Sequence, residues 1–163
     1  MSPTMLDPRS LRDAFGSFAT GVTIVTTRNA AGADIGRTAN SFSSVSLDPP
    51  MVLWSLAKTS SGQADFHRAR HFAVHVLGED QEDLSGLFAS KAADRFGALS
   101  VTRGADGIPL LEGCAARFEC RTVHRYDGGD HVIFVGEVMD FVREPRAPLL
   151  FHAGRYGRLQ AAE

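Results

Sequence analysis

Residues 38–50 read Thr-Ala-Asn-Ser-Phe-Ser-Ser-Val-Ser-Leu-Asp-Pro-Pro, a run of short polar side chains that ends in two prolines. Residues 41–47 alternate between polar and apolar side chains, which is typical of an extended strand. Pro49 and Pro50 exclude both a helix and a central strand at the end of the run. We therefore expect an extended segment that is closed by a turn at residues 48–50.

The segment before this run is rich in β-branched residues. Residues 22–27 read Val-Thr-Ile-Val-Thr-Thr and predict a strand. Residues 29–32, Asn-Ala-Ala-Gly, predict a turn, and residues 35–39 would return as the hairpin partner. Further upstream, Asp7 and Pro8 suit the start of a helix that ends before Gly21. The apolar residues of that helix fall on one face: Leu11, Ala14, Phe15 and Phe18.

The rest of the chain continues with short strand and helix patterns. Residues 91–113 show no clear pattern, and such stretches in compact domains are often functional or mobile. Residues 115–126 and 131–143 predict a long antiparallel hairpin around Gly128 and Gly129. The other expected elements are strands at 51–57, 72–77, 148–151 and 155–159 and helices at 60–70 and 81–88. This order predicts a mainly β fold with short helices, an antiparallel barrel with the helices packed outside it.

Length and composition limit the function classes. The chain has 163 residues, which fits one domain spanning residues 1–163. Its net charge of −2, from 17 basic and 19 acidic residues, argues against nucleic-acid binding through a large basic surface. Cys114 and Cys120 are too few for a disulfide framework and fit a reducing compartment. Residues 1–8 lack signal-peptide features, and no apolar run is long enough for a membrane span, so we expect a cytoplasmic protein.

Familiar catalytic motifs are absent from the sequence. There is no G-x-G-x-x-G, Walker A, H-E-x-x-H, Cys-x-x-Cys or Gly-x-Ser-x-Gly pattern. His67, His71 and His75 are spaced as on one helix, but His75 lies within a strand pattern. Surface and strand histidines are therefore the better interpretation than a metal site.

Three local clusters could each bind a ligand or be purely structural. Residues 38–46 could hydrogen-bond a heteroaromatic or anionic ligand, or form a polar turn. Residues 58–61, Lys-Thr-Ser-Ser, could hold a phosphate at a helix start, or only cap that helix. His131, which follows the Gly128-Gly129 turn, could face a pocket or be simply half exposed.

Several stretches together carry a family pattern: residues 18–27, 38–50, 72–77, 88–89, 129–131, 136–138, 148–150 and 154–156. In this order they resemble the short-chain flavin reductase family, the small reductase component of two-component flavin-dependent monooxygenases. The likeness covers about residues 8–159, and residues 38–50 are its most specific part. Two positions depart from the pattern: His75 stands where the family often has Asn, and His152 where it often has an aromatic residue.

The resemblance implies a split β-barrel that binds FMN or FAD, usually as a homodimer. It assigns Thr38, Ala39, Asn40, Ser41 and Phe42 to the isoalloxazine ring, and Ser43, Leu56, Ala57 and Lys58 to the border of the ring or ribityl chain. It assigns Ser60 and Ser61 to phosphate, and Phe88, Lys91, Arg95 and Phe96 to the flavin tail or its entry. His131 matches a histidine near the nicotinamide, and Tyr156 a C-terminal tyrosine beside the pocket. Among the phenylalanines, we expect Phe15, Phe18, Phe72, Phe118 and Phe134 in the core, and Phe42, Phe88 and Phe96 near the flavin.

The implied activity is that of an NAD(P)H-dependent flavin reductase, an oxidoreductase of class EC 1.5.1. Hydride would pass from NADH or NADPH to FAD or FMN, and the reduced flavin would leave for a partner monooxygenase. The alternative is a non-catalytic flavin-binding or electron-transfer protein on the same barrel. An enzyme acting through Ser or Cys has little support. Arg37, Arg95 and Arg155 are all candidates to bind a 2′-phosphate, so the sequence leaves the choice of nucleotide open. No nucleic-acid or membrane partner is expected.

Overall fold

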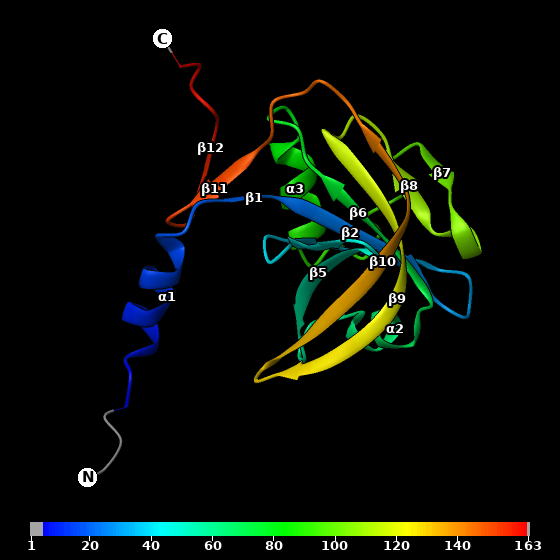
Figure 1. Ribbon diagram of the computed structural model, residues 1–163, viewed down its shortest axis with the longest axis horizontal. Coiled ribbons are helices and arrows are strands. Elements are labelled where there is room, and N and C mark those ends of the chain that lie inside the picture. The colour runs from blue at the N-terminus through cyan, green and yellow to red at the C-terminus, as the bar shows by residue number, and fades with distance from the viewer. Residues whose placement is uncertain (1–4, 163) are drawn as a thin grey trace.

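A computed structural model describes residues 5–162 of the chain (Figure 1). Its main feature is a seven-stranded sheet in which every neighbouring pair is antiparallel. The strands in sheet order are β3 (Asp34–Ala39), β2 (Thr23–Arg28), β6 (His71–Val76), β9 (Ala116–Gly128), β10 (His131–Arg143), β5 (Pro50–Ala57) and β4 (Ser43–Leu47). The mainly β architecture is therefore confirmed.

The link between β3 and β4 explains why the sheet curls into a barrel. These two strands are the opposite edges of the sheet, yet only residues 40–42 separate them in the chain. A link this short holds the two edges close together, so the sheet must bend round on itself. Ser41 fastens the closure, because its Oγ donates to the Ser55 carbonyl oxygen at 2.9 Å and accepts from the Ser55 N–H at 2.9 Å.

Aromatic side chains fill the barrel. Trp54 is fully buried, stacks on Phe134 at a centroid distance of 5.0 Å and meets Phe66 edge-on at 4.9 Å. Each such pair contributes about 0.5–1.5 kcal/mol beyond its buried area. Phe72 and Phe134 are core residues, as the sequence predicted. Phe118 is only half buried and stacks against Phe42 at the edge of the same cluster.

Short helices and two small sheets surround the barrel. The helices are α1 (Pro8–Gly16), α2 (Gln63–Arg68), α3 (Glu82–Ala89) and a 3₁₀ turn, η1 (Ala105–Gly107). The small sheets are β1 (Thr20–Gly21) with β11 (Leu150–His152) and β12 (Arg155–Gly157), and β7 (Val101–Arg103) with β8 (Pro109–Leu111). The expected irregular stretch 91–113 therefore contains two short strands, and the expected helix 60–70 is confined to six residues.

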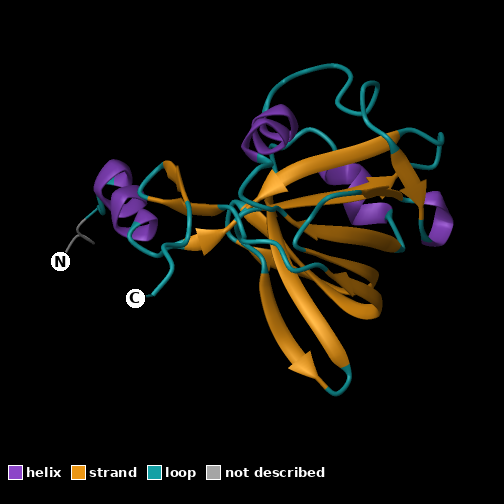
Figure 2. Cartoon of the chain, turned by 90° about the horizontal axis from the view of Figure 1, so that it is seen from above, coloured by secondary structure: helices purple, strands orange, loops and turns teal. Residues whose placement is uncertain are grey.

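The first helix corrects one expectation. Asp7 caps it as predicted, accepting from the Ser10 N–H at 2.9 Å. The placement of Phe15 and Phe18 in the core is wrong, because they are 70% and 79% exposed. Figures 1 and 2 show why: α1 extends away from the barrel beside the β11–β12 hairpin, so its apolar face meets little of its own chain. Periodicity identified an amphipathic helix but not what that helix packs against.

Two further expectations concern the chain as a whole. Cys114 and Cys120 are both free and buried. Within residues 5–162, no helix combines the length and the apolar character needed to cross a membrane. The expectation about the N-terminal residues 1–8 falls partly outside the described part of the chain, since residues 1–4 are not described.

Candidate functional site

A cavity with a volume of about 710 Å³ lies against β3; we call it the β3 cavity. Its walls are β3, the segment that leads into α2, and the loop that follows α3. Eight residues that the sequence assigned to a flavin site line it: Thr38, Leu56, Ser60, Ser61, Phe88, Lys91, Arg95 and Phe96. The barrel therefore gathers in one place residues that are far apart in the sequence.

A smaller cavity of about 210 Å³ adjoins it, and we call it the Tyr156 cavity. Thr38 and Ala89 line both cavities, whereas Ala39, Asn40 and Tyr156 line only the smaller of the two. Ser85 fixes this wall from α3. Its carbonyl oxygen accepts from the Thr38 Oγ1 at 2.7 Å, and its hydroxyl lies 2.8 Å from the Tyr156 hydroxyl.

Several residues assigned to the flavin lie outside both cavities. Ser41 is engaged with Ser55, Phe42 packs on Phe118, and Ser43 lies exposed on the edge strand β4. The remaining members of this group are Ala57, Lys58 and His131, which lie together at the tip of the β9–β10 hairpin.

The tip of this hairpin forms a small polar cluster. His131 pairs with Ala57 in the β10–β5 register, one position beyond the cavity-lining Leu56. The Nδ1 of His131 lies 2.7 Å from the Asp130 carboxylate, and this hydrogen bond lowers the pKa of Asp130. Lys58 pairs with Asp127. The histidine side chain is 43% exposed, so its role in a ligand site stays a prediction.

Arg37 also lines the β3 cavity, although the sequence offers it only as a candidate for binding a 2′-phosphate and not for the flavin. Its Nε donates to the Ser61 carbonyl oxygen at 2.7 Å and lies 3.3 Å from the Ser60 hydroxyl. Its Nη2 bonds the Ser61 hydroxyl. Burial and then the nearby Arg95 lower the pKa of Arg37. An arginine directly before the run at residues 38–50 was the only signal for it in the sequence.

Phe88 and Phe96 form an aromatic wall of the β3 cavity. Their rings meet edge-on at a centroid distance of 5.0 Å, and Phe88 is fully buried. Gly36 on β3 makes this approach possible, since a Cβ there would lie only 2.4 Å from Phe88 Cε1. The wall thus depends on a missing side chain in the strand below it.

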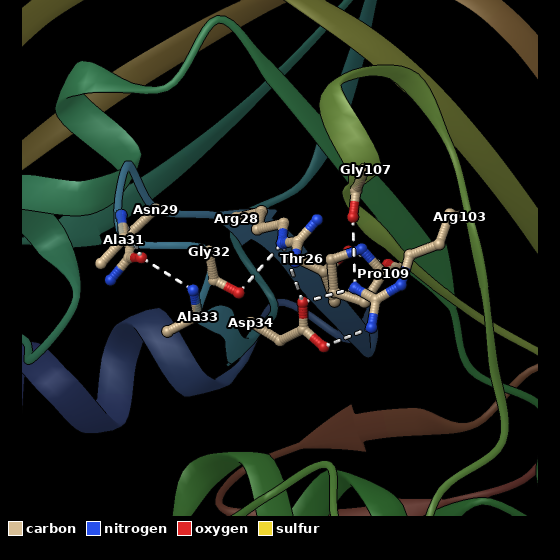
Figure 3. Close-up of polar contacts among 10 residues, drawn as sticks. All are labelled: Thr26, Arg28, Asn29, Ala31, Gly32, Ala33, Asp34, Arg103, Gly107 and Pro109. Carbon is tan, nitrogen blue, oxygen red and sulfur yellow. Dashed lines mark hydrogen bonds and ion pairs between the residues drawn. The ribbon is translucent and has the colours of Figure 1, made fainter.

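An ion pair fixes Asp34, one of the residues that line the β3 cavity; Figure 3 shows its contacts. Arg103 on β7 binds the Asp34 carboxylate through both terminal nitrogens, at 2.5 and 3.0 Å. Arg28 approaches the same carboxylate at 4.0 Å. The Thr26 hydroxyl donates to the Pro109 carbonyl oxygen at 2.6 Å, which joins β2 to the β7–β8 hairpin as well. These contacts hold the end of the loop that carries Lys91 and Arg95.

The turn beside this ion pair is fixed by its own side chains, as Figure 3 also shows. The Asn29 carboxamide oxygen accepts from the N–H groups of Ala31 and Ala33, at 3.1 and 2.9 Å. Arg28 donates to the Gly32 carbonyl oxygen at 3.0 Å. The predicted turn at residues 29–32 is therefore confirmed, and its fixed backbone orients Asp34 in the wall of the β3 cavity.

The three histidines considered for a metal have separate environments. His75 is fully buried on β6, where Nδ1 donates to the Ile24 carbonyl oxygen at 2.9 Å and Nε2 accepts from the Leu111 N–H at 3.0 Å. Burial lowers its pKa to about 4. His71 lies 2.6 Å from the Asp106 carboxylate, and His67 is exposed on α2. Among residues 5–162, no group of three His, Cys, Asp or Glu side chains has metal-binding geometry.

Comparisons with known proteins agree with this architecture. The chain is 48% identical to a probable flavin reductase of Rhizobium meliloti (strain 1021), over 96% of this chain and 50% of that protein. It is 49% identical to the FMN reductase (NADH) SmoA of Agrobacterium fabrum (strain C58), over 92% of this chain and 85% of the relative. It spans about half the length of some curated relatives, the Rhizobium protein among them.

Solved structures and a family profile extend the likeness to the fold. The NADH:FAD oxidoreductase SgcE6 of Streptomyces globisporus C-1027 superposes with a TM-score of 0.90 at 40% identity, covering 98% of both chains. Residues 15–160 match the profile described as "Flavin reductase like domain". The match spans the barrel, both cavities and the β11–β12 hairpin. With its split β-barrel fold, the chain therefore belongs to the flavin reductase-like family.

Proposed function

We propose that residues 1–163 form one flavin reductase domain that oxidises NADH or NADPH, reduces FAD or FMN, and supplies the reduced flavin to a partner monooxygenase. This places the activity in class EC 1.5.1. One observation carries the proposal: a cavity lined by three cations, one of whose three carboxylates is paired with Arg103 outside it, adjoins a smaller, mostly apolar cavity at Thr38. A flavin combines an apolar ring system with an anionic tail, so the two cavities match its two parts.

The residues present fit such a group. Arg37, Lys91 and Arg95 line the β3 cavity, and the Nε of Arg95 is buried without a hydrogen-bond partner within residues 5–162. A buried donor of this kind is costly unless a ligand satisfies it. Ser60 and Ser61 add hydroxyls to the same wall. We assign these residues to the phosphorylated tail. The sequence already named Ser60 and Ser61 for phosphate and Lys91 and Arg95 for the tail or its entry, and we add Arg37 because it lines the same wall.

The flavin would supply the redox chemistry, accepting hydride from the nicotinamide. The chain's own part is to bind and orient. Thr38, Ala39 and Asn40 would border the ring, and Tyr156, held by Ser85, would close its side of the cavity. His131 would position the nicotinamide with Nε2, because Nδ1 faces Asp130. The absence of a nucleophile–base pair among the cavity residues is compatible with this, since the protein needs only to place two rings together.

The oligomeric state is also a proposal. We infer a homodimer, because α1 presents Leu11 and Phe15 to solvent and contains no buried residue, and Phe18, just beyond its end, is exposed as well. A helix of nine residues is marginal in water without packing partners. A second copy would cover this face. Light scattering at micromolar concentration should give twice the chain mass, and a monomer at that concentration would contradict the inference.

One observation favours the alternative of a non-catalytic flavin-binding protein: His131 lines neither cavity. The two functions differ in the fate of NADH. Steady-state oxidation of NADH and NADPH should be measured with FAD and FMN, in all four combinations. Flavin-dependent turnover with at least one nucleotide supports the reductase, whereas flavin binding without any turnover supports the alternative.

The role of His131 can be tested with a matched control. We expect His131→Ala to raise the KM for NADH and to leave the Kd of the flavin unchanged. His67→Ala, which changes an exposed histidine on α2, should alter neither value. Unchanged steady-state kinetics in His131→Ala would remove this residue from the site.

A further inference from the structure

The charges of the β3 cavity are unevenly compensated. The cations on its wall are Arg37, Lys91 and Arg95, and the carboxylates are Asp34, Asp65 and Asp94. Asp34 is bound by Arg103 from outside the cavity. Asp94 accepts the N–H groups of Phe96 and Gly97, at 3.0 and 2.8 Å. Only Asp34 is paired with a cation from outside the cavity, so three cations face the two carboxylates Asp65 and Asp94, an excess of one positive charge.

Two of these cations oppose each other. Burial and then the positive charge of Arg95 lower the pKa of Arg37, so the two guanidinium groups of the cavity repel each other. Within residues 5–162, neither pairs with a carboxylate: Arg37 is held by Gly36, Ser60 and Ser61, and Arg95 donates to the Ser90 carbonyl oxygen at 2.5 Å. Adjacent guanidinium groups without a carboxylate match a ligand with more than one negative charge.

The size and the aromatic wall of the cavity point to more than a phosphate. Its volume of about 710 Å³ is more than three times that of the adjoining Tyr156 cavity, which is about 210 Å³. A terminal phosphate would leave most of this space empty. Phe96 is half buried, and its ring forms part of the lining together with Phe88. An aromatic face beside paired cations suits a purine nucleoside that is joined to a diphosphate.

We propose that the β3 cavity binds the adenosine diphosphate portion of FAD, so that the chain prefers FAD to FMN, with Arg37 as the residue that sets this preference. The proposal rests on the proposed function for its ligand, a flavin. The same diphosphate chemistry occurs in the nicotinamide dinucleotide. The position of Thr38 favours FAD over the nicotinamide dinucleotide. Thr38 lines both cavities, so it joins the diphosphate site directly to the segment assigned to the flavin ring.

The test measures binding rather than turnover. Kd values for FAD, FMN, riboflavin and NAD⁺ should be determined by titration of the full chain. We expect FAD to bind at least about tenfold more tightly than FMN, since a second charge-assisted phosphate contact is involved. Arg37→Gln should reduce the ratio of FAD affinity to FMN affinity to near one and leave the affinity for riboflavin unchanged. Arg121→Gln, on an exposed arginine paired with Glu137, should keep the wild-type ratio.

Each other outcome overturns the proposal. Equal affinity for FAD and FMN in the wild type contradicts it, as does an equal loss of both in Arg37→Gln. If Arg37→Gln weakens NAD⁺ but not FAD, the cavity belongs to the nicotinamide nucleotide. Arg95→Gln provides a second variant should Arg37→Gln fail to fold, and it should lower the same ratio. A preference for FAD without oxidation of either NADH or NADPH would reject the proposed function and retain this inference.

Discussion

Gly36→Ala tests whether the aromatic wall of the β3 cavity depends on the absence of a side chain. Gly36 is buried on β3, and its φ lies outside the left-handed region, so space alone decides the effect of a methyl group. The new Cβ would lie 2.4 Å from Phe88 Cε1, 2.7 Å from Phe88 Cδ1 and 3.1 Å from Phe96 Cζ. The Phe88 ring is fully buried, so it cannot move without disturbing the cluster around it.

The expected size of the effect follows from two opposing terms. Overpacking of a filled core costs about 1–3 kcal/mol. Replacing glycine by alanine restricts the unfolded chain and returns about 0.4–1 kcal/mol. We therefore expect the free energy of unfolding of Gly36→Ala to fall by about 0–2.6 kcal/mol. In a domain of this length, each kcal/mol lowers the Tm by roughly 2–4 °C. FAD affinity should fall as well, because Phe96 is displaced.

Urea unfolding of four variants measures this effect: Gly36→Ala, Phe88→Leu, the double variant of the two, and a control. Gly21→Ala is the matched control, because a Cβ at Gly21 would meet nothing within 4 Å. It should be neutral or slightly stabilising. The double variant Gly36→Ala/Phe88→Leu should show a favourable coupling of about 0.5–3 kcal/mol, since the smaller side chain relieves the clash. The reasoning is refuted if Gly36→Ala is as stable as Gly21→Ala, or if the coupling is zero.

Three further predictions concern groups buried in or around the barrel. Burial lowers the pKa of His75 from 6.5 to about 4, so on acidification the unfolded chain binds a proton at this residue before the folded chain does. Urea titrations should therefore show a free energy of unfolding that is intact above pH 6.5 and falls by roughly 3 kcal/mol down to pH 4, and His75→Gln should lack this fall. Burial also raises the pKa of Cys114 to about 11 and that of Cys120 to about 12. At pH 8 both thiols should therefore react with a disulfide reagent only at the rate at which the chain unfolds around them, and rapid labelling of the native protein would contradict their burial. The effects of Asp34→Asn and Arg103→Gln on the free energy of unfolding should be coupled by only about 0.5–1 kcal/mol in a double-mutant cycle, because Arg103 is half exposed. Each variant should also weaken FAD binding, whereas additive effects on stability would show that the pair does not hold the cavity wall.

Most strands could be predicted because their evidence is local. The β-branched run at residues 22–27 and the glycine turn before His131 each contain enough information to specify a strand or a hairpin. The exposed α1 shows where local evidence ends. Phe15 and Phe18 have the spacing of a buried face, but spacing does not say whether the surface that covers it belongs to the same chain.

The site was predicted only in part for a related reason. The serines at 60 and 61 and the residues around Phe88 could be named because they belong to recognisable segments. Asp34 could not, because its partner Arg103 is 69 residues away. The contact between Arg37 and Ser61 spans 24 residues and exists only once the barrel has closed. The positions of such residues are a property of the fold, and no short pattern contains them.

The closure of the barrel also determines how the run at residues 38–42 can contact a ligand. The Thr38 hydroxyl is bonded to Ser85, and the Ser41 hydroxyl to Ser55. The Phe42 ring is packed on Phe118. Most side chains of the run therefore already have partners within the chain, and only Asn40 remains exposed beside the Tyr156 cavity. A flavin ring at this wall would be held by backbone groups and by Asn40, so recognition there depends on the shape of the closure, whereas discrimination between flavins depends on the charged residues of the β3 cavity.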